Sequence, residues 1–176
     1  MHLRGMRVRL ASTLWAVTVL IPCPTSGATP VDGAAPALPA TAVITYTFTD
    51  SSVPPQYHRS WTMTVTPNRS DITVDSYGSV LAQRSATTAV GVWDALSAGF
   101  PTVVESVELA RRRTAPQGCT GGTTEAVRVE DGPDVLIEQS VYNCGGTNSD
   151  VAETLRAWIA PARSQFPPTD VMAPPG

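Results

Sequence analysis

Few residues in this chain have side chains at a spacing that could support catalysis. In the loop that spans residues 50–60, His58 could act as a general base, with Asp50 as the group that orients it. No serine stands in the G-x-S-x-G pattern of a nucleophile elbow, and nothing singles out another serine as the nucleophile. A Ser/His/Asp hydrolase is therefore possible from the residue types, but the pattern does not favour it.

The sequence contains no recognisable metal or cofactor site. Its three cysteines and two histidines include no pair or triplet with the spacing of zinc ligands. No glycine loop of the phosphate-binding type follows a run of strand-like residues. We therefore predict no metal and no other cofactor.

Residues 50–60 (DSSVPPQYHRS) are instead the best candidate for recognition of a partner. Two consecutive prolines stiffen the loop, and an aromatic ring, a titratable ring and a guanidinium follow in succession. The alternative is that the prolines only set the connection between two strands while the polar groups face water. The predicted binding residues are Asp50, Tyr57, His58 and Arg59.

Two cysteines, Cys119 and Cys144, stand at the ends of a predicted β-hairpin. The dipeptide Asp131-Gly132 lies midway between them and is typical of a tight turn between β-branched runs. Antiparallel pairing about this turn would bring the two sulfurs together. Cys23 lies in the predicted signal peptide described below, so the exported domain keeps only these two cysteines. An even number of cysteines in an exported domain favours a disulfide over a metal site or a catalytic thiol. We predict a Cys119–Cys144 disulfide that clamps the hairpin.

The first 28 residues have the pattern of a secretory signal peptide. Three arginines precede the apolar run 11–21, and small residues lead to a cleavage site after Ala28. The apolar run is shorter than the roughly 20 residues of a membrane-spanning helix, so we predict no membrane span. We expect a secreted or extracytoplasmic protein of the cell envelope.

A lipid anchor is the alternative at this terminus. Cys23 follows Leu20-Ile21-Pro22, which is similar to the end of a bacterial lipoprotein signal. That signal has a small residue before its cysteine, and Pro22 is a poor substitute. The pattern favours release over lipidation.

Apolar and polar residues alternate in the first half of the chain, as they do in strands. In two later stretches the apolar residues recur at helical spacing instead. The order of strands, helix, hairpin and helix predicts a single α+β domain at 42–161, with an antiparallel sheet and two helices packed on one face. We expect a flexible linker at 29–41 and a loose, proline-rich tail at 162–176. Three tryptophans should lie between sheet and helices: Trp61, Trp93 and Trp158.

The expected elements follow from the same periodicities and from their breaker residues. They are strands at 43–49, 61–66 and 72–74, a continuation or fourth strand at 80–84, a helix from Thr87 or Thr88 to Gly99 and Pro101, a strand at 103–109, the hairpin, and a helix from Ser149 to Pro161.

The charge balance argues against nucleic acid as a partner. The chain has 12 basic residues, all arginine, against 15 acidic ones, for a net charge of −3. A nucleic-acid-binding domain needs a basic surface. The one basic run, residues 111–113, is more typical of a solvated loop or of a site for trypsin-like cleavage.

Several short motifs together resemble those of a family of small exported bacterial domains of unassigned function. The motifs are SSVPPQYHRSW, VDSYG, CTGG and CGG before a final helix, and the resemblance covers about residues 43–160. It implies an exported α+β domain with a disulfide. It implies no activity, substrate or catalytic residue.

The sequence therefore predicts a non-enzymatic extracytoplasmic binding module whose partner is a protein or a cell-envelope ligand. Two alternatives remain. A secreted hydrolase would use His58, and a secreted protease inhibitor would present the segment Arg111–Thr114 as an exposed, extended loop.

Overall fold

The computed structural model describes residues 36–113, 121–144, 146 and 148–167. The predicted signal peptide, Cys23 and most of the predicted linker lie outside these residues. The elements are β1 (Val43–Thr49), β2 (Ser60–Val65), β3 (Ser70–Ser76), β4 (Ser79–Ala86), α1 (Val90–Arg112), β5 (Thr123–Asp131), β6 (Asp134–Asn143) and α2 (Ser149–Arg163).

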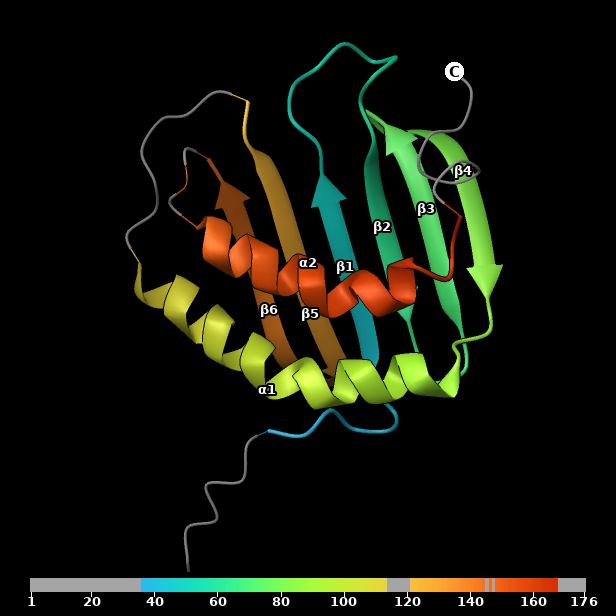
Figure 1. The fold of residues 1–176 in the computed structure, drawn as a ribbon, viewed down its shortest axis with the longest axis vertical. Helices are drawn as coiled ribbons and strands as arrows, with labels where there is room; N and C mark the ends of the chain where they lie inside the picture. The colour runs from blue at the N-terminus through green and yellow to red at the C-terminus, as the bar shows by residue number, and fades with distance from the viewer. Residues whose placement is uncertain (1–35, 114–120, 145, 147, 168–176) are drawn as a thin grey trace, which may run out of the picture. The chain divides into compact units, whose positions relative to one another are not determined.

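The six strands form one antiparallel sheet in the order β4-β3-β2-β1-β5-β6. Both helices lie on the same face of this sheet (Figure 1). The predicted class, an α+β domain with two helices on one face, is confirmed. The stretch at 80–84 belongs to a separate strand, β4, which pairs with β3 after a turn at Tyr77 and Gly78.

Alternation along the strands decides which side chains meet the helices. In β1, Ile44 and Tyr46 are buried on the helix-covered face, whereas Thr45 and Thr47 are half-buried on the other face. The core consists of the buried apolar side chains of the sheet and of both helices. Trp61 and Trp158 are buried there as predicted, and Trp93 packs against the core while partly exposed.

Helix α1 does not end at Pro101, and the predicted strand at 103–109 is wrong. The helix runs on to Arg112, with Pro101 inside it. Its buried face continues across the proline at helical spacing, from Phe100 to Val103 and Val107. Burial of this continuous face outweighs the lost backbone hydrogen bond, and the helix changes direction near its middle (Figure 1).

Helix α2 likewise continues past the proline that was expected to end it. Pro161 lies inside the helix, which runs to Arg163. Ala162 and Phe166 are buried in the core, at spacings that continue the apolar face from Ile159. The packed part of the chain therefore extends beyond 161, and the expectation of a loose tail is wrong for the described residues up to 167.

Neither helix begins with a side-chain cap. The N-cap of α1 is Ala89, and the hydroxyl of Thr88 instead hydrogen-bonds that of Ser70 at 2.8 Å between the oxygens. Gln165 accepts from the backbone N–H of Ala89 through its side-chain oxygen. The residues after α2 thus satisfy the start of α1, a long-range contact that local sequence cannot indicate. In α2 the N-cap is Asn148, and Ser149 is the first helical residue.

The predicted hairpin is confirmed, with its turn one residue later than expected. Gly132, with a φ of 57°, follows the paired position Asp131, and β6 begins at Asp134. The register pairs Thr123 with Asn143, which would place residue 122 opposite Cys144. The argument from equal hairpin arms therefore does not hold. Cys144 is buried and Cys119 lies outside the described residues, so the disulfide stays a prediction.

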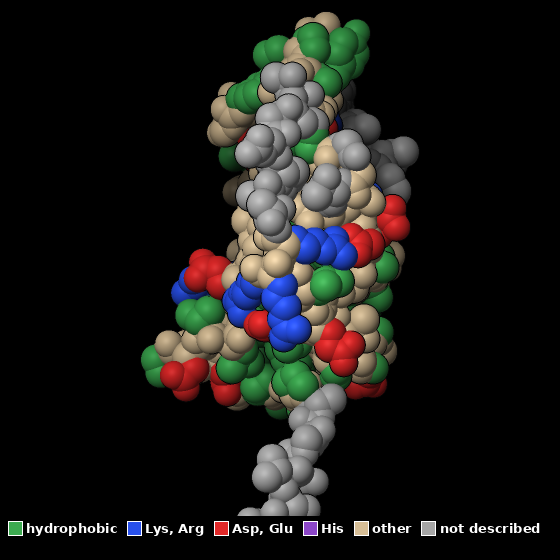
Figure 2. Space-filling model, turned by 90° about the vertical axis from the view of Figure 1, so that its left-hand side faces the viewer, with side chains coloured by type: hydrophobic (Ala, Val, Ile, Leu, Met, Phe, Trp, Pro, Cys, Tyr) green, Lys and Arg blue, Asp and Glu red, His purple; other side chains and the backbone are tan. Residues whose placement is uncertain are grey.

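Most of the basic run at 111–113 is helical and does not form an extended loop. Arg111 and Arg112 form the last turn of α1, and Arg111 pairs with Glu108. Arg113 forms two hydrogen bonds with Asp150 and lowers the pKa of that carboxyl to about 2. Figure 2 shows acidic and basic side chains next to one another on this side of the molecule. Within the described residues, no helix is long and apolar enough to cross a membrane.

The close crossing of the two helices makes Gly99 a sensitive position. A Cβ at residue 99 would lie 2.8 Å from Cδ1 of Trp158, whose Nε1 donates to the carbonyl of Leu96. We predict that Gly99→Ala lowers the free energy of unfolding by about 1–3 kcal/mol, despite the better helix propensity of alanine. Urea unfolding measures the change. Gly91→Ala, with nothing within 4 Å of the added carbon, is the control and should be neutral or stabilising. Equal effects of the two changes would contradict this packing.

Candidate functional site

The register of the sheet aligns three functional side chains in one row on the helix-covered face. Phe48 of β1 pairs with Trp61 of β2 on one side and with Glu125 of β5 on the other. Two strand spacings, about 9.5 Å, therefore separate Trp61 from Glu125. This row lies opposite α2.

Helix α2 runs across the strands, and the spacing of its arginines matches the row beneath it. Arg156 and Arg163 are seven residues apart, which is about 10.5 Å along one face of a helix. Arg156 contacts Glu125 and Arg163 lies over Trp61. The two basic side chains therefore stand above the two ends of the row, with Phe48 between them.

Glu125 anchors α2 to the sheet from inside the core. It is 0% exposed, and its Oε1 accepts from Nε and Nη2 of Arg156 at 3.0 and 2.6 Å. Its Oε2 accepts a short hydrogen bond from the hydroxyl of Tyr46. Burial, with Glu125 as the next cause, raises the pKa of Tyr46, and the same carboxylate raises the pKa of Arg156. The phenol stays neutral and the guanidinium charged, so both serve as donors to Glu125.

Arg163 is held differently from Arg156. Its Cζ lies 5.5 Å from the ring centroid of Trp61, a cation–π contact. Trp61 also stacks on Tyr46 and Phe48, with ring centroids 5.2 and 5.9 Å apart. Within the described residues, the side chain of Arg163 forms no hydrogen bond or ion pair, and its Nε is buried without a partner. The guanidinium is thus positioned by stacking alone, and its charge is not matched by a carboxylate there.

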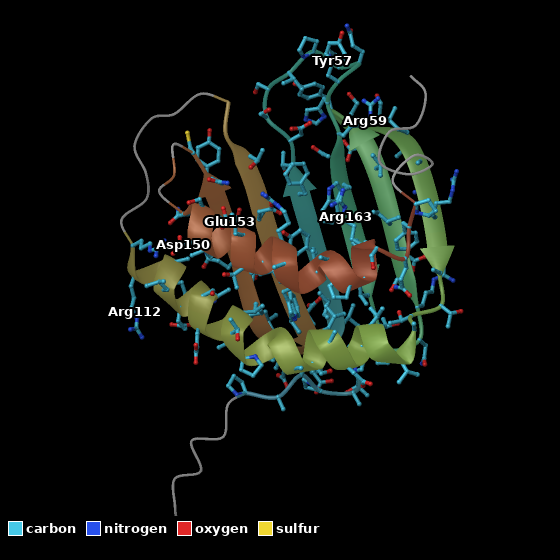
Figure 3. The ribbon with its side chains drawn as sticks, in the orientation of Figure 1. Tyr57, Arg59, Arg112, Asp150, Glu153 and Arg163 are labelled. Carbon is cyan, nitrogen blue, oxygen red and sulfur yellow. The ribbon has the colours of Figure 1, made fainter. Side chains whose placement is uncertain are left out.

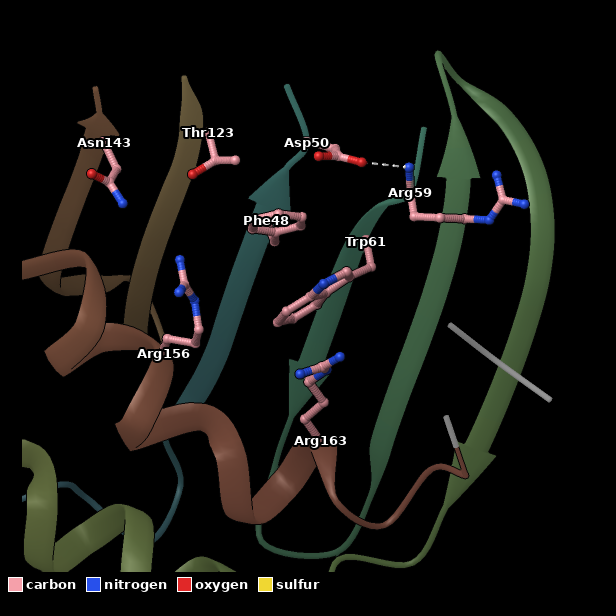
Figure 4. Close-up of a pocket in the computed structure, with 8 residues that line it drawn as sticks. All are labelled: Phe48, Asp50, Arg59, Trp61, Thr123, Asn143, Arg156 and Arg163. Carbon is pink, nitrogen blue, oxygen red and sulfur yellow. Dashed lines mark hydrogen bonds between the residues drawn. The ribbon is translucent and has the colours of Figure 1, made fainter. Parts of the chain in front are cut away.

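A pocket of about 570 Å³ opens above these residues, between α2 and the ends of the central strands. We call it the α2 pocket (Figure 4). This volume is within the range of small-molecule sites. The lining residues are Phe48, Asp50, Arg59, Trp61, Thr123, Asn143, Arg156 and Arg163.

Of the four residues predicted from sequence, Asp50 and Arg59 line the α2 pocket. The carboxylate of Asp50 accepts from the backbone N–H groups of Ser51 and Arg59 at 2.8 and 2.9 Å, so it fixes the base of the loop. The side chain of Arg59 points away from Phe48 and Trp61 (Figure 4), and its Nη1 donates to the carbonyl of His58. Both residues shape the rim of the pocket.

Tyr57 and His58 do not join the pocket. Tyr57 lies at the tip of the loop, 68% exposed (Figure 3). His58 is only 3% exposed and stacks on Tyr77 with ring centroids 3.9 Å apart. Tyr57 and His58 therefore do not share one exposed surface, because the loop closes over the imidazole.

The hydrogen bonds of His58 do not suit a general base. Its Nδ1 accepts from the backbone N–H of Tyr77 at 3.3 Å, so the neutral ring carries its proton on Nε2. That nitrogen faces the hydroxyl of Ser60 at 3.3 Å, and this hydroxyl already accepts from the backbone N–H of Asp50. A base would need a lone pair toward the serine. Among the described residues, no group of three His, Cys, Asp or Glu side chains could hold a metal ion.

Sequence reasoning missed Glu125, Arg156 and Arg163. Glu125 did leave a signal, because it stands on the same face of its strand as Val127 and Val129, where an apolar residue is expected. The seven-residue spacing of the two arginines carried a second signal. Arg163 lies beyond Pro161, where the sequence predicts that the packed part of the chain ends.

Comparison of the chain with protein-family models, with curated proteins and with solved structures finds no match. The site must therefore be interpreted from its own chemistry.

Removal of Arg156 should expose the cost of burying Glu125. We predict that Arg156→Met lowers the free energy of unfolding by about 3 kcal/mol, because a carboxylate without its ion-pair partner stays in the core. Arg128→Met is the control: this arginine pairs with Glu130 and Glu138 at the surface, where water screens the ion pairs, so its loss should cost clearly less than that of Arg156. Chemical denaturation of both variants compares the two values.

The double variant Glu125→Gln/Arg156→Met separates the charge from the packing. It should recover part of the stability lost in Arg156→Met, because the buried charge is gone. Equal losses in Arg156→Met and Arg128→Met, or no recovery in the double variant, would contradict the anchoring role of this ion pair.

Proposed function

We propose that this protein is a non-enzymatic extracytoplasmic binding module that holds an acidic ligand in the α2 pocket. The observation that carries the proposal is Arg163. Its guanidinium lines the pocket and stacks on Trp61, yet it contacts no acidic side chain among the described residues. A fixed cation beside an aromatic surface is a favourable partner for an anion.

Most of the other arginines in the described part of the chain lend support by contrast. Arg156 is neutralised by Glu125, and the arginines at 69, 111, 113 and 128 each pair with a carboxylate. Arg84 and Arg112 form no ion pair among the described residues, but both are exposed. Arg163 differs from them because it is half-buried and lies over an aromatic ring in a pocket. The extracytoplasmic location rests on the predicted signal peptide, and the ligand would be offered by the envelope or by a partner protein.

The two alternative functions have less support from the described residues. A hydrolase would need His58 to accept a proton from Ser60, but the hydrogen bond from Tyr77 favours the opposite arrangement of the imidazole. An inhibitor would need an extended loop from Arg111, whereas Arg111 and Arg112 are helical.

Thermal unfolding in the presence of simple anions tests the proposal. The probes are sodium benzoate, sodium citrate and inorganic phosphate, compared with sodium chloride at equal ionic strength and with glucose. We predict a saturable rise in Tm with at least one of the three anions, by about 3–6 °C at ten times its Kd. Arg163→Met should abolish this rise.

Arg84→Met is the matched control, because Arg84 is exposed on β4 and away from the α2 pocket. It should keep the anion-dependent rise in Tm. The proposal fails if no anion exceeds sodium chloride, or if Arg163→Met responds as the unchanged protein does.

A further inference from the structure

We infer that the ligand of the α2 pocket carries a single carboxylate on a flat, apolar body, with a neutral polar group at its far end. This inference rests on the proposed function and specifies the chemical class of its ligand. It follows from the charge, the aromatic surface and the polar residues of the pocket, taken in turn.

The charges of the described lining residues leave a net charge of about one unit for a ligand to match. Glu125 already binds Arg156 through two hydrogen bonds, so this pair is neutral as a unit. Asp50 and Arg59 place one negative and one positive charge at the rim, and these charges offset each other. The guanidinium of Arg163 remains, and it stands in the last turn of α2, where the helix dipole offsets part of its positive charge. These surroundings suit a monoanion and oppose a dianion such as a phosphate monoester.

The donors of the pocket also differ from those of a phosphate site. Such sites commonly use the N–H groups at the start of a helix, whereas it is the C-terminal turn of α2 that brings Arg163 to the pocket. A planar guanidinium matches a carboxylate through two parallel N–H donors. The geometry therefore favours a carboxylate as the charged group.

The aromatic side chains provide the surface for the body of the ligand. Trp61 is nearly fully buried beneath its neighbours, whereas Phe48 is half-buried and lines the pocket between the two arginines. Figure 4 shows the Phe48 ring between Arg156 and Trp61. A flat ring can stack on Phe48 while its carboxylate reaches Arg163.

The opposite end of the pocket is polar and uncharged. Thr123 and Asn143 form a cross-strand pair of β5 and β6, and both line the pocket. They offer a hydroxyl and an amide, which can donate or accept. Arg163 lies over Trp61 of β2, and β6 is three strand spacings, about 14 Å, from β2. A ligand of two fused rings therefore fits between Arg163 and this pair.

Isothermal titration calorimetry with four related probes tests this class. The probes are 6-hydroxy-2-naphthoate, its methyl ester, 2-naphthyl phosphate and acetate. We expect the naphthoate to bind, and the ester and the phosphate to bind at least tenfold more weakly, which corresponds to the loss of one charge-assisted hydrogen bond. Acetate, which lacks the flat body, should show no measurable heat.

Three variants assign the contacts. Arg163→Met should weaken the naphthoate at least tenfold while leaving the weak binding of the ester unchanged. Phe48→Leu, which keeps an apolar side chain but removes the ring, should weaken both probes. Arg84→Met should change neither.

The possible failures are distinct from one another. If naphthyl phosphate binds as tightly as the naphthoate, or if citrate or phosphate binds through Arg163 while the naphthoate does not, the ligand class is wrong and the acidic-ligand function stands. If no anion binds in a manner that depends on Arg163, both the ligand class and the proposed function are wrong.

Discussion

The site depends on the ion pair between Glu125 on the sheet and Arg156 on α2. A carboxylate that is 0% exposed must have its charge and both oxygens satisfied, and Arg156 and Tyr46 together do this. Such a pair contributes less to net stability than its short distances suggest, because both charges lose water on folding. Its main effect is geometric: α2 can rotate or slide only if Arg156 leaves Glu125.

That constraint determines where Arg163 lies. Two turns of a helix are nearly as long as two strand spacings of a sheet. A helix anchored at Arg156 therefore places Arg163, seven residues later, above the strand that carries Trp61. The contact requires α2 to remain helical through Pro161, and the burial of Ala162 and Phe166 keeps it so. Helix packing, sheet register and one ion pair thus jointly create a pocket with a positive, aromatic wall.

The strands, the hairpin and the α+β class could be predicted because alternation and turn chemistry are local. The helix lengths could not, because Pro101 and Pro161 are strong local breakers whose effect was outweighed by burial of a continuous apolar face. Only part of the site could be predicted from the sequence. Asp50 and Arg59 lie in a conspicuous polar loop, whereas Arg163 matters only through the register that brings β2 beneath α2. His58 is the opposite case, since a polar residue in a loop is expected to reach the surface but this imidazole is buried.

The central claim, that Arg163 is a fixed cation open to an anion, is tested most directly by the NMR signal of its Nε–H in arginine-labelled protein. Because this nitrogen is buried beside Trp61, its proton should exchange slowly with water and be shifted by the indole ring. The account predicts that the signal is resolved and moves saturably as benzoate is added. A signal at the position of an unstructured arginine, unmoved by benzoate, would contradict it.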